Sequence, residues 1–120
     1  MSGACVMVGA LAVTLSGTGF DLRWQHSVEK TEWREHWDVA EGRLHLREAA
    51  VKGSGAGMDP GPGARLVRGW WVWSPDLPAV PALSLAASGA TAGGWMLCDG
   101  SDCREYGAAE GETVIIAPCR

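Results

Sequence analysis

Residues 20–28 read F-D-L-R-W-Q-H-S-V, and apolar and polar side chains alternate along them. One side of this segment carries Phe20, Leu22, Trp24, His26 and Val28, and the other carries Asp21, Arg23, Gln25 and Ser27. Successive side chains of a β-strand point to opposite faces, so a period of two predicts a half-buried strand. The chain is therefore expected to build a sheet with one face packed on a core.

The same pattern continues in the next segments. Residues 33–39 alternate again, Glu41-Gly42 marks a turn, and residues 43–51 place Leu44 and Leu46 on one face. These features predict a β-hairpin. After a Gly-rich loop at 52–64, strands are expected to resume in the following ranges: 66–73, 77–87, 95–98, 103–106 and 112–117. Pro78 and Pro81 restrict the 77–87 segment to an edge strand or to the beginning of one.

Length and composition agree with this reading. A chain of 120 residues supplies one domain, and its 17 Gly and six Pro suit many turns. We expect an all-β domain, a single small sandwich or barrel of about eight short antiparallel strands. The net charge of −4 and the sequence pI near 5.2 provide no general attraction to phosphate backbones. Nucleic acid is therefore not an expected partner.

The four cysteines are Cys5, Cys98, Cys103 and Cys119. Cys98 and Cys103 flank a turn-forming tetrapeptide and could face each other across a hairpin, which would leave Cys5 with Cys119. An even number of cysteines in a short chain permits disulfides in an oxidising compartment, with free structural thiols as the alternative. A zinc site is less favoured because the C-x4-C spacing is unusual and no His lies beside these cysteines. No metal and no cofactor are expected.

Residues 1–19 form an apolar N-terminal segment that is distinct in composition from residues 20–120. Its run from Cys5 to Leu15, CVMVGALAVTL, carries no charge and is too short to span a bilayer as a helix. The run has two readings, a first buried strand or a vestigial signal or membrane-associated segment. In the second reading it would associate the protein with a membrane.

Seven tryptophans can supply much of the apolar surface that so small a domain needs. Trp70, Trp71 and Trp73 cannot all point inward if they share a strand, because neighbours face opposite sides. We therefore expect Trp71 to be capped by the Gly-rich loop, exposed for a partner, or placed at a membrane interface.

Two segments carry more polar chemistry than turns require, namely His26 to Trp33 and Lys52 to Met58. The first contains Ser27, Glu29 and Lys30, and the second contains Gly53, Ser54, Gly55 and Gly57. Successive Gly and Ser N–H groups can form an anion-binding nest, to which Lys30 or Lys52 could add charge. The loop lacks the dinucleotide, P-loop and nucleophile-elbow patterns. A triad of Ser54, His26 and Glu29 can be drawn, but only geometry decides such an arrangement.

The chain resembles the DUF1850 family in three motifs: H-S-V-E-K-T-E-W (26–33), K-G-S-G-A-G-M-D-P (52–60) and G-W-W-V (69–72). The segments shared with that family fall on His26, Ser27, Glu29, Lys30, Trp33, Gly53, Ser54, Gly55, Gly57 and Met58. The resemblance implies a small bacterial or archaeal protein of undefined activity, encoded near TRAP transporters of the TAXI type. It also implies an accessory role in the periplasm or at the outer face of the cytoplasmic membrane. Longer members of the family carry a clearer membrane or export segment.

The leading hypothesis is a non-enzymatic accessory protein of a TAXI-type TRAP uptake system. Its partner would be the permease or the solute-binding protein, contacted through the 26–33 and 53–58 segments. The rival hypothesis is a small-anion-binding protein or an enzyme that uses the same two segments. In a third, purely structural reading, the Gly-rich loop only covers the end of the β domain.

Overall fold

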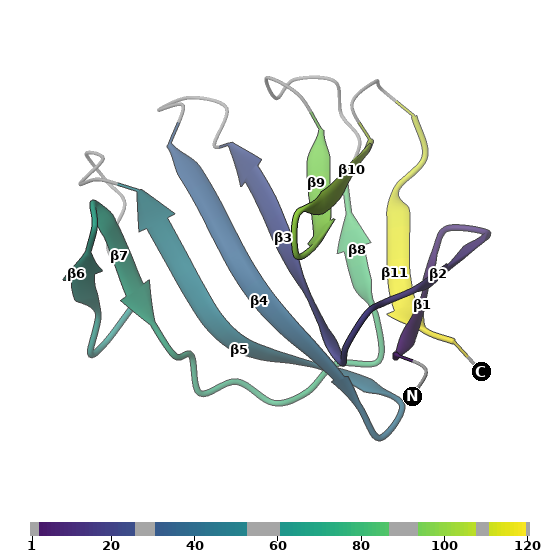
Figure 1. Cartoon of the computed structure of the whole chain (residues 1–120), viewed down its shortest axis with the longest axis horizontal. Helices are drawn as coiled ribbons and strands as arrows, with labels where there is room; N and C mark the ends of the chain where they lie inside the picture. The colour runs from purple at the N-terminus through teal and green to yellow at the C-terminus, as the bar shows by residue number, and fades with distance from the viewer. Residues whose placement is uncertain (1–2, 26–30, 53–60, 87–93, 108–110, 120) are drawn as a thin grey trace.

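The protein is a sandwich of two antiparallel sheets (Figure 1). The computed structural model describes residues 3–25, 31–52, 61–86, 94–107 and 111–119, and all regular elements in these ranges are strands. The smaller sheet has the order β2 (Leu11–Thr14), β1 (Cys5–Val8), β11 (Val114–Pro118), β8 (Leu83–Leu85). The larger sheet has the order β10 (Asp102–Tyr106), β9 (Trp95–Asp99), β3 (Gly19–Gln25), β4 (Glu32–Ala40), β5 (Arg43–Lys52), β7 (Trp70–Trp73), β6 (Arg65–Val67).

The core lies between the two sheets. Its buried side chains from the smaller sheet are Val6, Val8, Leu85 and Ile116, and those from the larger sheet are Phe20, Leu22, Trp37, Leu44 and Leu97. The predicted all-β class is confirmed, and of the two architectures expected it is the sandwich that forms. The described residues contain eleven strands rather than about eight, because two segments read as single strands are each divided by a turn.

The turns explain where the strands divide. The predicted turn at Glu41-Gly42 joins β4 to β5, with φ angles of 55° and 70°. Arg68-Gly69 forms a second turn of this kind, with φ angles of 51° and 87°, so residues 66–73 are a hairpin of β6 and β7. Positive φ at both central residues is what a two-residue type I′ hairpin turn requires, and glycine adopts it without strain.

The apolar N-terminal run forms the β1–β2 hairpin. Strand β1 lies between β2 and β11, and its Val6 and Val8 are buried in the core. Of the two readings of this segment, the folded domain therefore agrees with the first, a buried strand. Among the described residues, no helix is long and apolar enough to cross a membrane. Of the expected 77–87 strand only β8 forms, and it lies at an edge of its sheet, as Pro78 and Pro81 predicted.

A β-bulge in β5 changes which residues of that strand face the core. Its partner β4 pairs Trp37 with Leu46 but His36 with Glu48, so Arg47 is the extra residue. Before the bulge Leu44 and Leu46 share the core side, and after it Ala49 and Val51 take that side. Lys52 is thereby placed on the outer face, away from the smaller sheet.

Both expected disulfides form. Cys5–Cys119 joins β1 to the residue that follows β11, and Cys98–Cys103 joins β9 to β10 across their hairpin. The Cα–Cα distances are 5.3 and 4.0 Å, respectively. All four cysteines are thus paired, and among the described residues no group of His, Cys, Asp or Glu is arranged to hold a metal ion.

The two disulfides should contribute unequally to stability. Cys5–Cys119 closes a separation of 114 residues, whereas Cys98–Cys103 closes only five. On the chain-entropy model, removing the first by a double Cys→Ser change costs roughly 4 to 5 kcal/mol, and removing the second costs about 2 kcal/mol. Urea unfolding of the two double variants measures both values. A larger loss for the Cys98 and Cys103 pair would contradict this expectation.

Candidate functional site

The outer face of the larger sheet carries a row of cationic side chains. Phe20 and Leu22 of β3 face the core, so Asp21 and Arg23 face outward. Arg23 lies directly opposite Arg34 of β4, which in turn lies opposite Ala50 of β5. Side chains that are paired in this way have Cβ atoms only about 4.5 to 5.5 Å apart. The sheet register therefore places the two arginine residues side by side on the outer face.

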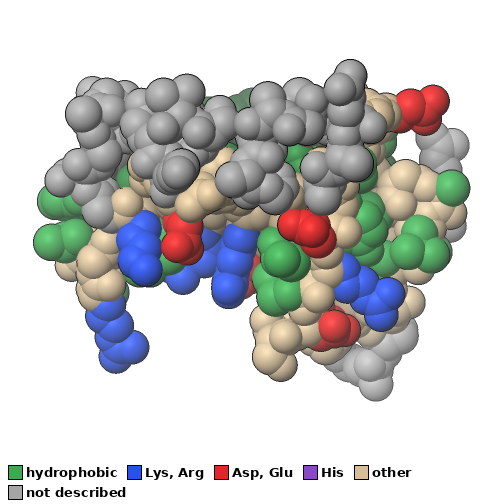
Figure 2. Space-filling model, turned by 90° about the horizontal axis from the view of Figure 1, so that it is seen from above, with side chains coloured by type: hydrophobic (Ala, Val, Ile, Leu, Met, Phe, Trp, Pro, Cys, Tyr) green, Lys and Arg blue, Asp and Glu red, His purple; other side chains and the backbone are tan. Residues whose placement is uncertain are grey.

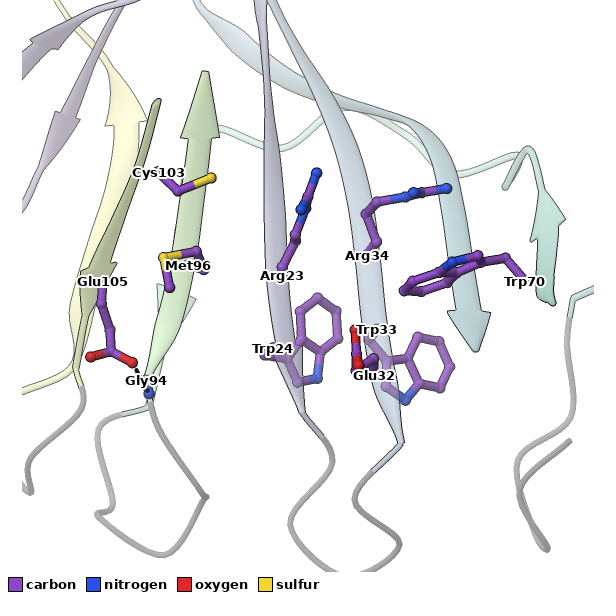
Figure 3. Close-up of a pocket in the computed structure, with 10 residues that line it drawn as sticks. All are labelled: Arg23, Trp24, Glu32, Trp33, Arg34, Trp70, Gly94, Met96, Cys103 and Glu105. Atoms are coloured by element: carbon purple, nitrogen blue, oxygen red, sulfur yellow. Dashed lines mark hydrogen bonds between the residues drawn. The ribbon is translucent and has the colours of Figure 1, made fainter. Parts of the chain in front are cut away.

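These arginines lie in a hollow of about 410 Å³ that crosses the outer face (Figure 3). Met96 and Cys103 border the hollow on the β9–β10 side, and Trp70 borders it on the β7 side. The residues that line its end near the strand termini are Trp24, Glu32, Trp33, Gly94 and Glu105. Figure 2 views the molecule from that end and shows Lys and Arg side chains gathered along one side, where the surface is hollowed. We refer to this hollow as the outer groove.

Trp70 holds two cations at the β7 side of the outer groove. The Arg34 guanidinium lies over its ring at 4.7 Å from the centroid, and the Lys52 ammonium lies at 5.8 Å. Lys52 is paired with Trp70 in the β5–β7 register. Cations are attracted to the negative face of an indole within about 6 Å. Arg34 and Lys52 are therefore positioned by an aromatic ring, and among the described residues neither forms an ion pair.

The carboxylates near the outer groove are engaged elsewhere or only loosely paired. Asp21 Oδ1 lies 2.7 Å from His36 Nδ1, within hydrogen-bonding distance. The other oxygen, Asp21 Oδ2, lies 3.8 Å from the Arg23 guanidinium. Glu105 accepts a hydrogen bond from the backbone N–H of Gly94 at 3.0 Å. The Arg23 side chain is 48% exposed, so its distant ion pair with Asp21 contributes little. Within the described ranges, the arginine pair thus keeps most of its hydrogen-bonding capacity available.

An aromatic cluster lies on the opposite, inner face at the same end of the sheet. Trp24 and Trp33 are cross-strand partners that stack at 5.9 Å, and Trp95 and Trp73 contact them at 5.1 and 6.0 Å. The Trp33 indole N–H is buried and has no hydrogen-bond partner among the described residues. These rings stiffen the strand ends from which the outer groove is built.

Glu35 is a half-buried carboxyl on the inner face of β4. Its cross-strand neighbours are Leu22 and Ala49, which are both buried. Burial raises the pKa of Glu35 above its ordinary value near 4.5, and a 3.1 Å hydrogen bond from Trp37 Nε1 opposes that rise. Because Glu35 faces away from the outer groove, we assign it no part in binding there.

Most residues predicted for the site lie outside the described ranges: His26, Ser27, Glu29, Lys30, Gly53, Ser54, Gly55, Gly57 and Met58. The strands that lead to these two segments are neighbours, since β4 pairs with both β3 and β5. Gln25 and Glu32 are paired at the end of β3 and the start of β4, and Trp33 is paired with Val51 next to the end of β5. The described residues that adjoin both segments therefore lie at the same end of neighbouring strands, at the top of Figure 1.

Three predicted site residues are described. Lys52 contacts Trp70 at the outer groove, and Trp33 borders the groove at the strand ends. Trp71 is paired with Val51 and Leu66 and is half-buried on the inner face, so the structure does not bring it to the outer groove. Its neighbour Trp70 stands there instead.

Arg23, Arg34 and Trp70 were not singled out from the sequence. A signal was present, because Arg23 and Arg34 stand on the polar sides of two alternating segments joined by a short connection. Their direct opposition depends on the β3–β4 register, which the length of the connection did not define. Because Trp70 and Trp71 are adjacent and identical in type, the sequence likewise did not show which of the two rings faces outward.

Fold and groove together define a class: a small disulfide-bonded β-sandwich with a cationic, aromatic-lined groove on one sheet face. A family model described as "Domain of unknown function (DUF1850)" matches residues 20–105. The chain belongs to the DUF1850 family, as its sequence motifs indicated. No curated protein and no solved structure matches it at a significant level.

Replacing the half-buried carboxyl should raise stability in a pH-dependent way. When folding raises the pKa of a carboxyl, the folded state binds its proton more tightly than the unfolded state does. The resulting stabilisation of the folded state is complete at pH values below the unfolded pKa. This contribution is lost as the pH rises through the folded pKa, so the Glu35 carboxylate destabilises the protein at pH 7. We expect Glu35→Gln, which retains an acceptor for Trp37, to increase the free energy of unfolding more at pH 7 than at pH 4. Urea unfolding at both pH values measures this difference, and an equal effect at the two would refute the argument.

Proposed function

We propose that this protein is a non-enzymatic accessory protein of a TAXI-type TRAP solute uptake system. It acts in the periplasm or at the outer face of the cytoplasmic membrane, and it contacts the permease or the solute-binding protein through the outer face of its larger sheet. The observation that supports this most directly is the outer groove, where Arg34 and Lys52 lie over Trp70 and Arg23 is paired with Arg34. Arginine and tryptophan are the side chains most enriched at the energetic centres of protein interfaces.

The chemistry of the outer groove supports recognition rather than catalysis. An arginine retains its proton at all physiological pH values, so Arg23 and Arg34 can bind and orient a group but cannot act as general bases. The carboxylates that border the groove, Glu32 and Glu105, are exposed. The described lining residues include no nucleophile paired with a base, so this set of residues suits a binding module better than an enzyme.

The proposed location is supported by the two disulfides. They use all four cysteines of a 120-residue chain, and disulfides of this kind persist in oxidising compartments. The TRAP partner itself is proposed from the family resemblance of the sequence motifs. The charged outer face gives this partner a defined place to dock.

The partner proposal predicts specific co-purification. Tagged protein recovered from detergent-solubilised membranes of its own cells should carry the TRAP permease or solute-binding protein with it. We expect Arg34→Glu to reduce that recovery several-fold, because it reverses the charge at the centre of the outer groove. Arg43→Glu is the matched control, since Arg43 is exposed at the opposite end of β5. Absence of both transporter proteins from the wild-type sample would disprove the proposal.

The location predicts blocked thiols in the native protein. When cells are lysed in denaturant with iodoacetamide, the intact mass of the protein should show no alkylated cysteine. After reduction, the same treatment should modify all four. Alkylation of all four without reduction, together with recovery in the cytosolic fraction, would rule out the proposed compartment.

A further inference from the structure

We propose that the outer groove is a binding site for a small organic carboxylate, which is held between Arg23 and Arg34 with its apolar part against one of the two apolar flanks of the groove, Met96 on one side or Trp70 on the other. This inference deepens the proposed function and rests on it in one respect, the use of the same outer face as the binding surface. The four residues come from four strands of the larger sheet, and all of them line one hollow of about 410 Å³ (Figure 3).

The arginine pair supplies the recognition of charge. Because Arg23 and Arg34 are direct cross-strand partners, their side chains leave the sheet side by side. In Figure 3 Arg23 extends along its own strand, and the end of Arg34 turns toward Trp70. Two like charges placed opposite each other destabilise a sheet unless an anion offsets them. A carboxylate has two oxygens and matches the planar fork of a guanidinium, so it is a suitable counter-ion for this position.

Trp70 orients Arg34 for this task. A guanidinium that lies over an indole ring uses its flat face for the cation–π contact, and its N–H groups point outward in its own plane. These N–H groups remain free to donate to a carboxylate at the rim of the ring. Trp70 also attracts the Lys52 ammonium, which adds a third positive charge on the same side. We therefore regard Trp70 as a positioning residue for Arg34.

Three carboxylates lie near the arginines, namely Asp21, Glu32 and Glu105, and among the described residues neither Glu32 nor Glu105 forms an ion pair with Arg23 or Arg34. Asp21 is held by His36 at 2.7 Å and approaches Arg23 only to 3.8 Å, and Glu105 is bonded to the Gly94 N–H. The whole chain is acidic, with a net charge of −4. Among the described residues of the groove, the positive charge is confined to the Arg23–Arg34 pair and to Lys52, with Glu32 and Glu105 further along the same groove. Such a charge pattern can attract a small anion to the arginine pair without attracting polyanions in general.

Apolar side chains on both sides of the arginines favour an organic anion over an inorganic one. Met96 precedes Arg23 in the cross-strand row, and the Trp70 ring follows Arg34. Thioether and indole surfaces gain free energy when apolar atoms cover them. A carboxylate that carries an aliphatic or aromatic portion would cover one of these apolar flanks while its oxygens contact the arginines, whereas phosphate would use only the charged part.

Titration of the isolated protein with benzoate tests this proposal. We expect saturable binding by calorimetry, with shifts of the Trp70 Nε1–H and of the Arg23 and Arg34 Nε–H signals in ¹H–¹⁵N spectra. Arg34→Gln and Arg23→Gln should each weaken benzoate binding about tenfold or more, since each removes a charged hydrogen-bond donor. The matched control Arg43→Gln, at the far end of β5, should leave the affinity within about twofold. If either glutamine variant fails to fold, the corresponding lysine variant keeps the charge but loses the fork, and should show an intermediate loss.

Two further probes define the chemical class. Benzamide has the shape of benzoate without its charge and should not bind, and inorganic phosphate should bind much more weakly than benzoate. Benzamide binding as tight as benzoate would mean an apolar pocket only, and phosphate binding as tight would mean an unselective anion site, so either result overturns the proposal. Absence of saturable benzoate binding also overturns it. No transporter is present in this experiment, so its outcome is separate from that of the co-purification test.

Discussion

The register between β3 and β4 is the constraint on which both faces of the larger sheet depend. It sets Trp24 against Trp33 on the inner face and Arg23 against Arg34 on the outer face. A slip of one residue would exchange the faces of every side chain on one strand, because the side-chain period is two. The Trp24–Trp33 stack at 5.9 Å and the Phe20–Trp37 pair in the core oppose such a slip. Aromatic packing inside therefore maintains the arginine pair outside.

The ends of the chain meet in the smaller sheet. Strand β1 pairs with β11, and Cys5–Cys119 joins them covalently. These contacts have a long sequence separation, so their loop-closure entropy is large, and the disulfide lowers this cost of folding by restricting the unfolded chain. The smaller sheet supplies Val6, Val8, Leu85 and Ile116 to the core. It covers the inner face of the larger sheet and leaves the outer face, with its groove, open to solvent.

The outer groove links the fold to the two functional proposals. A transporter subunit and a small carboxylate would use the same residues, because both are recognised by a guanidinium pair beside an aromatic ring. The strands that adjoin the 26–33 and 53–58 segments end at the edge of this groove. The residues shared with the DUF1850 family therefore border, in sequence, the described side chains that form it. An accessory protein that senses a carboxylate and contacts a transporter would need no second site.

The sequence by itself determined the β class, the β4–β5 hairpin turn at Glu41-Gly42 and the pairing across the Cys98–Cys103 hairpin. These features are local, because side-chain alternation, turn residues and short loop closure act within a few residues. Only the tertiary structure decided which face of each strand became the outer one. The bulge at Arg47 moved Lys52 to the side opposite Leu44 and Leu46, and packing of the inner face against the smaller sheet left Arg23 exposed and Arg34 half-buried on the outer face. Alternation specifies that neighbours differ in face, but the choice of face requires a second layer that lies far away in the sequence.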